Sequence, residues 1–553
     1  MRHIKLAPNW LRFLIVVVLV VGVFFRFLNL DSKVYGHDET YTSLRISGYT
    51  KIEVRQQIFN GRVVNREAFA RFQRINPEKN LGDTLKSLAI EDPQHPPLYY
   101  IVARLWAQIF GTSVTAIRSL SVIISLLVFP CIYLLCRELF NVPLSVPFLA
   151  IALVAISPIH LIYAQEAREY ILWVVTILTS STSLLRALRL ESKRQVSDAW
   201  RQAASPLGGA AQMRLRTATW GIYTLTLALS LYTSLLSGFV AAAHGIYVMT
   251  TTRFRWTKIA RIYTIAALSG FLIFTPWILV ILSNLLQFHR GIAETTRKFS
   301  PFTLIQSWLL KLSHIFLDLD FGLENPLSYP MTYIFLIIVG YSIYFLCRTT
   351  HPKTWLFIVL LIAVPALPLM LPDLIIGGTR TTAEQYLIPS YLGIQLAVTY
   401  LFAYQLYDAI LTLRRIWQII FVLVIVCGVF SCAVSSQAET WLSKGVSSGN
   451  PQVAKTINQA SRPLLMSDSF DMNYGNVFSL SYLVEPKVRF LLLKDKNIPK
   501  IPKGFTDVFL LNPSSTLRQG IEKKYKSKIN RVYSGKYYSL WKVAKLSVGK
   551  KDT

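Results

Sequence analysis

The stretch LRFLIVVVLVVGVFFRFL, residues 11–28, is the first of a series of apolar runs, and the acidic stretch YGHDETY follows it at residues 35–41. A helix needs about 20 mostly apolar residues to cross a bilayer. The chain of 553 residues is 53% hydrophobic and only 16% charged, whereas soluble proteins carry about 25% charged residues. Because the apolar residues are collected in repeated runs, the sequence predicts a polytopic membrane protein. Residues 11–28 lack a small-x-small cleavage site, so we expect a retained first span.

The apolar runs and the positions of the cysteines argue against two other classes of protein, nucleic-acid binders and disulfide- or metal-stabilised domains. The formal net charge of +29 is typical of soluble nucleic-acid binders, but such proteins lack bilayer-length apolar runs, so we expect no nucleic-acid partner. All five cysteines lie within or at the ends of apolar runs, and none forms a CxxC pair. A disulfide framework or a thiolate metal site is therefore not expected.

Eleven apolar runs have the length and composition of membrane spans. They are residues 11–28, 117–136, 143–160, 170–187, 218–234, 235–252, 260–284, 329–347, 354–372, 386–407 and 415–434. A shorter run, 98–110, is interrupted by Arg104, and we expect it to form an interfacial or re-entrant helix. The fold class predicted is an all-α polytopic membrane protein with interfacial helices.

Lysine and arginine clusters indicate the orientation of these spans, because short cytoplasmic loops are rich in both residues. The clusters lie at 186–217, 253–261, 348–353 and 414–415. All four are cytoplasmic if the N-terminus is cytoplasmic and 98–110 does not cross. The outer face then carries residues 29–116, the turn near 158–169, the segments 285–328 and 373–385, and the C-terminal tail.

The tail beyond about Ser435 has the pattern of a small separate domain. Short apolar runs at 463–466, 488–493, 507–511 and 538–543 alternate with helix-compatible stretches at 451–461 and 515–525, which is typical of an α/β unit. We therefore divide the chain into a membrane domain, 1–434, which includes the first outer loop 29–116, and an extracytoplasmic α/β domain, 435–553. The tail carries 20 Lys and Arg against 8 Asp and Glu. Its basic surface is either a solvated face, which we favour, or a contact with anionic membrane lipids.

Four segments of the predicted outer face carry residues suited to chemistry. Asp38 and Glu39 are adjacent carboxylates just after the first span, and they are either functional or merely solvated. His95 precedes the 98–110 helix within EDPQHPPLYY, residues 91–100. Arg168 lies in the turn between two spans, where it either pairs with Glu166 or Glu169 or binds a lipid phosphate. Arg380, on the glycine-flanked loop 377–389, is a second candidate anion site.

The order of these motifs carries a resemblance to a known family. Asp38-Glu39 after the first span, then His95-Pro96-Pro97-Leu98-Tyr99-Tyr100, then residues 164–170 (AQEAREY) resemble glycosyltransferase family 39 of the GT-C superfamily. That family includes protein O-mannosyltransferases and bacterial aminoarabinose transferases of lipid A. Tyr386-Leu387-Ile388-Pro389 is similar to its late arginine-tyrosine-leucine-proline signature, except that Gln385 stands where relatives often have arginine. The resemblance covers about residues 10–400.

The resemblance implies a glycosyltransferase of the inner (plasma) membrane that uses a polyprenyl-phosphate sugar donor. The sugar would pass, with inversion, to a hydroxyl of a lipid, glycan or protein on the outer face. Asp38 would be the catalytic base. Glu39 and His95 would orient sugar or acceptor, Arg168 and Arg380 would bind the departing phosphate, and Tyr170 would line the same pocket.

No obligatory cofactor is expected. A divalent metal is possible, because Asp38, Glu39 and His95 offer oxygen and nitrogen ligands, but their spacing matches no standard metal motif. The alternative hypothesis is a transporter or lipid flippase, which predicts repeated halves with interrupted helices, and we find no such repeat. An inactive scaffold that displays the basic tail is a third possibility.

Overall fold

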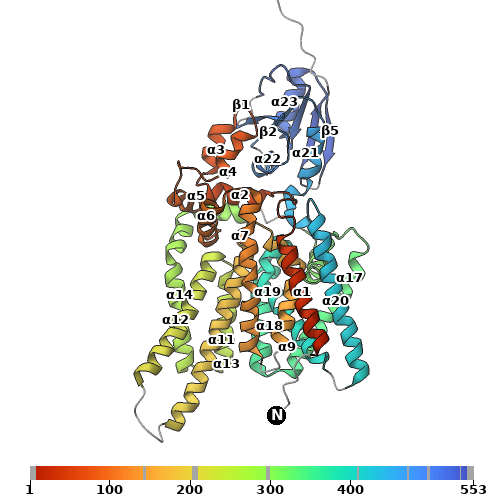
Figure 1. Cartoon of the computed structure of the whole chain (residues 1–553). Helices are drawn as coiled ribbons and strands as arrows, with labels where there is room; N and C mark the ends of the chain where they lie inside the picture. The colour runs from red at the N-terminus through yellow and green to blue at the C-terminus, as the bar shows by residue number, and fades with distance from the viewer. Residues whose placement is uncertain are drawn as a thin grey trace, which may run out of the picture. The chain divides into compact units, whose positions relative to one another are not determined.

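The computed structural model describes residues 8–140, 145–201, 209–293, 299–407, 410–469, 472–494, 498–535 and 537–544. The described chain is mostly helical and contains one six-stranded sheet, which confirms the predicted fold class (Figure 1). It divides into two compact units. The first comprises residues 1–28, 92–99 and 118–436, and the second comprises residues 29–91, 100–117 and 437–553.

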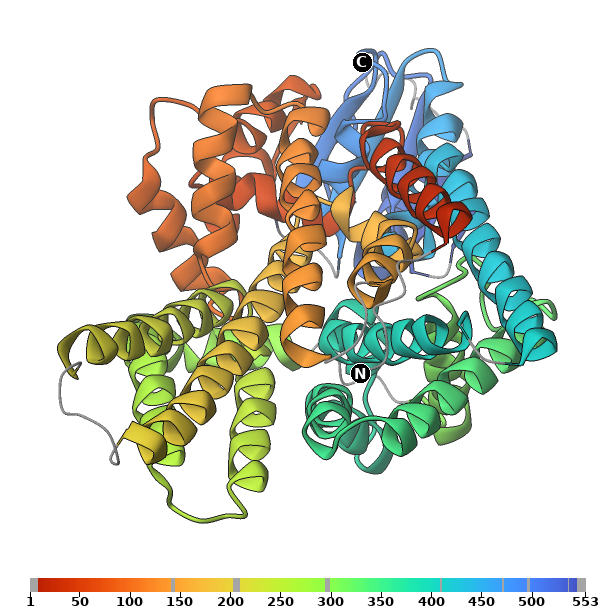
Figure 2. The same ribbon diagram turned by 60° about the horizontal axis from the view of Figure 1, so that its bottom comes forward.

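The first unit is a bundle of apolar helices. Its elements are α1 (Asn9–Phe27), α8 (Val128–Leu139), α9 (Ser145–Ala155), α10 (Pro158–Ala164), α11 (Tyr170–Arg201), α12 (Gly209–Thr233), α13 (Ser237–Thr251), α14 (Lys258–Ser283), α15 (Leu285–Ala293), α16 (Pro301–Ser313), α17 (Ser328–Thr349), α18 (Pro352–Ile375), η1 (Arg380–Thr382), η2 (Glu384–Leu387), α19 (Ile388–Gln405) and α20 (Leu411–Gln437). Helices α6 (Leu98–Phe110) and α7 (Val114–Leu126) each have residues in both units. Figure 2 shows α11, α12 and α14 as neighbours, and α17, α18 and α19 as a second group.

The number of membrane spans differs from the prediction. Within the described residues, eight helices are long and apolar enough to cross a bilayer, or nine if the bent pair α9–α10 counts as one span. The predicted spans 218–234 and 235–252 correspond to α12 and α13, and α13 has only 15 residues. The count of eleven is therefore not confirmed. The shorter apolar run 98–110 forms α6 with the predicted ends.

The predicted turn near 158–169 contains a further short helix. Helix α9 ends at Ala155, and α10 begins at Pro158 after a bend of 62°. Proline disfavours helical backbone at the preceding residue and supplies no N–H, so it ends one helix and begins the next. The bend directs residues 165–169 into the interior of the first unit, where all five are buried.

Polar side chains satisfy the carbonyl groups that this bend exposes. The buried guanidinium of Arg26, on α1, donates to the carbonyl oxygens of Ala155 (2.5 Å) and Val154 (3.1 Å) at the end of α9. Gln165 Nε2 in turn donates to the carbonyl oxygens of Phe25 (2.8 Å) and Leu28 (2.9 Å) at the end of α1. Each segment thereby caps the other, which fixes the residues that follow α10.

The second unit is built on a sheet with the strand order β1-β3-β2-β4-β6-β5. Its elements are α2 (His37–Ile46), α3 (Lys51–Ile58), β1 (Asn60–Val64), α4 (Glu67–Gln73), α5 (Leu81–Glu91), η3 (Leu442–Gly449), α21 (Asn450–Asn458), β2 (Pro463–Asp468), α22 (Asn473–Ser481), β3 (Arg489–Leu493), β4 (Asp507–Leu511), α23 (Ser515–Tyr525), β5 (Ile529–Ser534) and β6 (Ser539–Val543). Strands β3, β2 and β4 are parallel, whereas β1, β6 and β5 join their neighbours antiparallel. The predicted α/β pattern is thus present, with β1, β5 and α22 in addition.

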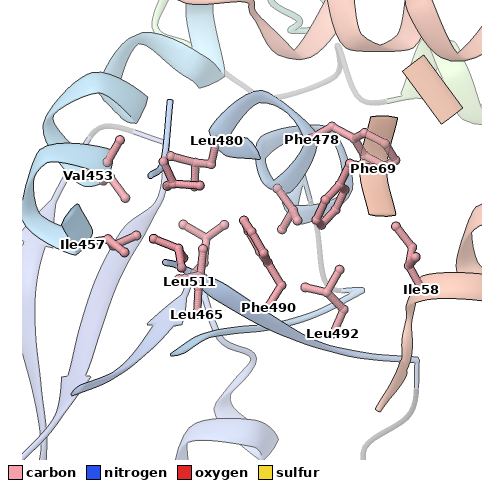
Figure 3. Close-up of a cluster of buried hydrophobic side chains, with 14 of the residues drawn as sticks. Ile58, Phe69, Val453, Ile457, Leu465, Phe478, Leu480, Phe490, Leu492 and Leu511 are labelled. Carbon is pink, nitrogen blue, oxygen red and sulfur yellow. The ribbon is translucent and has the colours of Figure 1, made fainter. Parts of the chain in front are cut away.

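The central strands are apolar on both faces, as parallel strands covered by helices must be. Leu464, Met466 and Leu491 face the layer that contains α23. Leu465 and Phe490 face a second core, which α21 and α22 cover (Figure 3). The first outer loop completes this second core. Ile58 of α3 and Phe69 of α4 lie among its buried side chains, and β1 extends the sheet beside β3.

The predicted domain boundary at 434/435 lies two residues from the division at Ser436/Gln437. Most of the first outer loop, which the prediction assigned to the membrane domain, belongs to the second unit together with the tail. The loop belongs there because α3 and α4 share a hydrophobic core with the C-terminal sheet. The prediction missed this because the pattern of each single element does not reveal which distant segments pack against one another.

A bulky residue at Gly22 should destabilise the first unit. A Cβ at Gly22 would overlap the carbonyl oxygen of Ala155 on α9, and small residues at such positions let helices approach closely. We expect Gly22→Leu to lower the stability by about 1–3 kcal/mol, as overpacking does. Thermal unfolding of the detergent-purified protein checks this. The matched control is Gly221→Leu, because a Cβ at Gly221 meets no atom within 4 Å, and equal melting temperatures for the two variants would contradict the prediction.

Candidate functional site

Three of the predicted site residues lie together in the first unit. Glu169 Oε1 is 2.9 Å from His95 Nδ1 and 3.3 Å from Arg168 Nη2. The Arg168 guanidinium also lies over the ring of Tyr170, 5.5 Å from its centroid. The structure thus brings His95, Arg168 and Tyr170 into one cluster around Glu169, which was one of the two acidic partners that the sequence offered for Arg168.

Both ends of this cluster are positioned by backbone geometry. Arg168 and Glu169 lie between α10 and α11, where the bend after α9 leaves them buried. His95 lies in the turn before α6, its N–H bonded to the carbonyl oxygen of Asp92 at 2.9 Å. The indole N–H of Trp277, on α14, donates to the carbonyl oxygen of Pro93 at 3.1 Å and so holds this turn.

The electrostatics of the cluster keep Glu169 ionised. Burial alone would raise the pKa of its carboxyl, but the charges of Arg168 and His95 and the His95 hydrogen bond lower that pKa to about 2. Within the described residues, Glu169 Oε2 is buried and has no hydrogen-bond partner. A guanidinium carries five N–H donors, so Arg168 can bind Glu169 and an anionic ligand together. A buried ionisable group whose pKa is shifted by specific charged partners is a candidate for a functional site.

A second polar cluster of the first unit was missed by the sequence reasoning. His314, just after α16, lies 2.7 Å (Nδ1) from Glu384 Oε1 and 3.9 Å (Nε2) from Asp318 Oδ1. Lys311 Nζ is 4.0 Å from the same Glu384 oxygen. Burial lowers the pKa of His314, but the carboxylates of Asp318 and Glu384 outweigh it and raise the pKa to about 9. The i, i+4 spacing of His314 and Asp318 was the one available signal, and their partner Glu384 is distant in sequence.

Tyr163 links the two clusters. Its ring packs edge-on against Tyr170, with ring centroids 5.0 Å apart, and its hydroxyl donates to Gln385 Oε1 at 3.2 Å. Gln385 is the residue that departs from the resemblance to the family signature, and its amide oxygen accepts the hydrogen bond of the Tyr163 hydroxyl. A neutral hydrogen bond therefore stands where the resemblance predicts an arginine.

Arg380 is paired with a different acidic residue from Arg168. Its Nη1 is 3.3 Å from Asp373 Oδ1, and Thr381 donates to Asp373 Oδ2 through its N–H (2.8 Å) and its hydroxyl (2.7 Å). The Arg380 side chain is 27% exposed and forms an ion pair with Asp373.

The adjacent carboxylates of the second unit have different environments. Helix α2 begins at His37, so Asp38 and Glu39 lie in its first turn. Glu39 is fully buried, and its Oε2 accepts hydrogen bonds from the Gly36 N–H (3.1 Å) and from Lys444 Nζ (3.0 Å). Asp38 is exposed, and within the described chain its carboxylate makes no hydrogen bond or ion pair. Of the two adjacent carboxylates, that of Glu39 is therefore buried inside the protein, whereas that of Asp38 is accessible to solvent.

The structure shows the partners of two of the candidate metal ligands, Glu39 and His95. In the part of the chain that the structure describes, no group of three or more His, Cys, Asp and Glu side chains has the arrangement of a metal site. Glu39 is committed to Lys444, and His95 to Glu169. The expectation that no metal is obligatory stays a prediction.

Comparisons with known proteins give one family-model match and several matches to solved structures. A family model described as dolichyl-phosphate-mannose-protein mannosyltransferase matches residues 94–214, which include His95, Arg168 and Tyr170. Curated proteins gave no match. Among solved structures, the chain is similar to apo ArnT from Cupriavidus metallidurans, with 12% identity, a TM-score of 0.54 and coverage of 97% of this chain and 98% of ArnT. The same protein bound to undecaprenyl phosphate matches with 14% identity, a TM-score of 0.50 and the same coverage. The chain therefore has the fold of ArnT over nearly its whole length.

The His314 cluster predicts a dependence of stability on pH. Because the pKa of His314 is raised to about 9, its protonated form stabilises the folded state fully below the unfolded pKa of about 6.5. That stabilisation is lost as the pH rises through about 9. We expect the melting temperature of His314→Gln to lie below that of the wild type at pH 6, and the gap to shrink by about pH 10. The exposed His289→Gln is the control. A gap that stays constant with pH would contradict the assignment.

Proposed function

We propose that this chain is a glycosyltransferase of the GT-C superfamily and transfers a sugar from a polyprenyl-phosphate donor to an acceptor hydroxyl, which its ArnT-like fold and the family-model match over residues 94–214 support. The observation that carries this proposal is the cluster of the buried Arg168 and Glu169 with the half-buried His95, at the N-terminal end of helix α11. A guanidinium at that depth suits the phosphate of a lipid carrier, because it matches phosphate oxygens with parallel N–H donors.

The donor phosphate removes the need for an acid catalyst. A glycosidase protonates its leaving group with a second carboxyl group, whereas a lipid phosphate leaves as an anion that Arg168 stabilises. The acceptor oxygen attacks the anomeric carbon as the bond to the phosphate oxygen breaks. The acceptor proton passes to a base, and the configuration at the anomeric carbon inverts.

Asp38 suits the role of base, because its carboxylate is exposed at the start of α2 and is not committed to an ion pair within the described chain. His95 and Tyr170 are assigned to donor binding, since both contact Arg168. Glu39 is fully buried against Lys444, which favours a role inside the protein over direct contact with sugar. Arg380, held by Asp373, is assigned a secondary role in phosphate binding.

The site of action proposed is the outer face of the inner membrane. The chain is an integral membrane protein by its apolar helices and its fold. The proposed orientation places the N-terminus in the cytoplasm and the C-terminal domain outside, as the lysine and arginine clusters indicate. The acceptor class would be identified by mass spectrometry of the lipid, glycan and protein fractions of cells from which the gene has been deleted.

Removal of the base should abolish transfer. We expect Asp38→Asn to lower turnover by about 10²- to 10⁴-fold, which is the usual contribution of a general base. The measurement is sugar transfer in proteoliposomes that contain donor and acceptor extracted from the source membranes. Asp31→Asn is the control, because Asp31 is also exposed on the first outer loop. Asp38→Asn protein that transfers at the wild-type rate would show that the base is another residue.

Removal of the guanidinium should weaken binding of the lipid phosphate. We expect Arg168→Ala to raise the concentration of undecaprenyl phosphate needed to inhibit transfer by roughly 10²-fold, because one charge-assisted contact is lost. The double variant Arg168→Ala/Glu169→Gln leaves no buried unpaired carboxylate and should show the same loss of inhibition. The exposed Arg255→Ala is the control. Unchanged inhibition of both Arg168 variants would remove the phosphate role.

A further inference from the structure

The C-terminal tail holds the backbone just before Asp38. Three main-chain groups between residues 34 and 37 are hydrogen-bonded to residues of the tail. These bonds are Val34 N–H to the Glu439 carbonyl oxygen (2.8 Å), Ser479 Oγ–H to the Tyr35 carbonyl oxygen (2.6 Å) and His37 N–H to Ser447 Oγ (2.7 Å). Both serines are buried. The entry into α2 is therefore fixed by partners more than 400 positions away in the sequence.

A buried ion pair holds the residue just after Asp38. Lys444 Nζ lies 3.0 Å from Glu39 Oε2, and the two side chains are 3% and 0% exposed. The same carboxylate oxygen accepts the Gly36 N–H and so caps one main-chain donor at the start of α2. A buried carboxylate is tolerated when a cation and hydrogen bonds compensate it. Lys444 therefore compensates the buried carboxylate that caps the helix.

Packing and further hydrogen bonds support these contacts from behind. The ring of His37 lies against Gly475 on α22 so closely that a Cβ there would overlap Nδ1. Ser447 Oγ donates to Asn476 Oδ1 at 3.5 Å. Asn450 Nδ2 donates to Ser479 Oγ at 2.7 Å. The groups that hold residues 35–39 are thus themselves held by η3, α21 and α22.

Asp38 is the exception within this framework. Its backbone lies between two anchored residues, His37 and Glu39, while its own side chain is exposed. A catalytic group must be held close to its productive geometry, because a misplacement of about 1 Å can cost about 10²-fold in rate. The tail supplies this restraint through the neighbours of Asp38 and leaves the carboxylate accessible.

We propose that Lys444 is a positioning residue for the catalytic base Asp38, and that the C-terminal domain serves the transfer reaction by fixing the first turn of α2. This role rests on the proposed function, in which Asp38 accepts the acceptor proton. In this role, Lys444 is a basic residue of the tail that acts neither as part of a solvated face nor as a contact with membrane lipids. Without Lys444, the buried Glu39 carboxylate loses a compensating charge, and the turn that carries Asp38 must rearrange to hydrate or protonate it.

The test uses the full-length protein in proteoliposomes, with donor and acceptor extracted from the source membranes. Lys444→Met should lower kcat by about 10- to 100-fold and change the KM for the donor less than twofold. Binding of undecaprenyl phosphate, measured separately, should be unchanged. Lys444→Arg keeps the charge and should recover at least half of the rate. The control is Lys455→Met, because Lys455 is an exposed lysine of α21 in the same domain.

The Asp38→Asn background separates positioning from simple loss of structure. If Lys444 acts through Asp38, then Lys444→Met should change the residual rate of Asp38→Asn less than twofold. An equal fold-loss of kcat on Lys444→Met in the wild-type and Asp38→Asn backgrounds would show a structural role and overturn the proposal. The proposal would also be overturned if Asp38→Asn abolished transfer while Lys444→Met kept the wild-type kcat. If Asp38→Asn itself transfers normally, the base assigned in the proposed function is wrong, and the positioning role falls with it.

Discussion

An arginine that neutralises no acid holds the candidate donor site in place. The guanidinium of Arg26 is buried at the end of α1, and it donates to the main-chain carbonyl oxygens of Ala155 and Val154 at the end of α9 and to that of Gly22 on α1. Carbonyl groups at a helix end have no partner within the helix, and within a bilayer water does not supply one. Since Gln165 caps α1 in return, the bend between α9 and α10 is satisfied on both sides. The cluster around Arg168 follows from that bend.

The same physical problem, a charge out of water, is solved in each unit by a pair. Glu169 is compensated by Arg168 and His95 in the first unit, and Glu39 by Lys444 in the second. Breaking such a pair on one side costs more than the pair contributes to stability, because an uncompensated buried charge is left behind. Substitutions at these positions therefore report on placement of neighbouring groups as much as on direct contact with substrate.

Much of the architecture could be predicted from the sequence, because it depends on local patterns. The run of residues 98–110 became α6 with the predicted ends, and the apolar runs of the tail became strands of one sheet. The family motifs singled out His95 and Arg168, and the structure brings the two side chains together. Contacts between distant segments could not be predicted. Neither the bond of His314 to Glu384 nor that of Lys444 to Glu39 leaves a periodicity or a spacing, and β1 is a short, mostly exposed strand.

The place of β1 in the sheet has a consequence for biosynthesis. Strand β1, residues 60–64, pairs with β3, residues 489–493, so the edge of the sheet can close only after most of the chain has left the ribosome. Contacts of such long range form late, because the entropy of loop closure precedes their gain. Helix α2 receives its partners from η3 and α22 at the same stage. An incomplete chain in the membrane would therefore carry α2, with Asp38 and Glu39, before its partners from the tail are present. We expect the protein to gain its activity only once translation is complete.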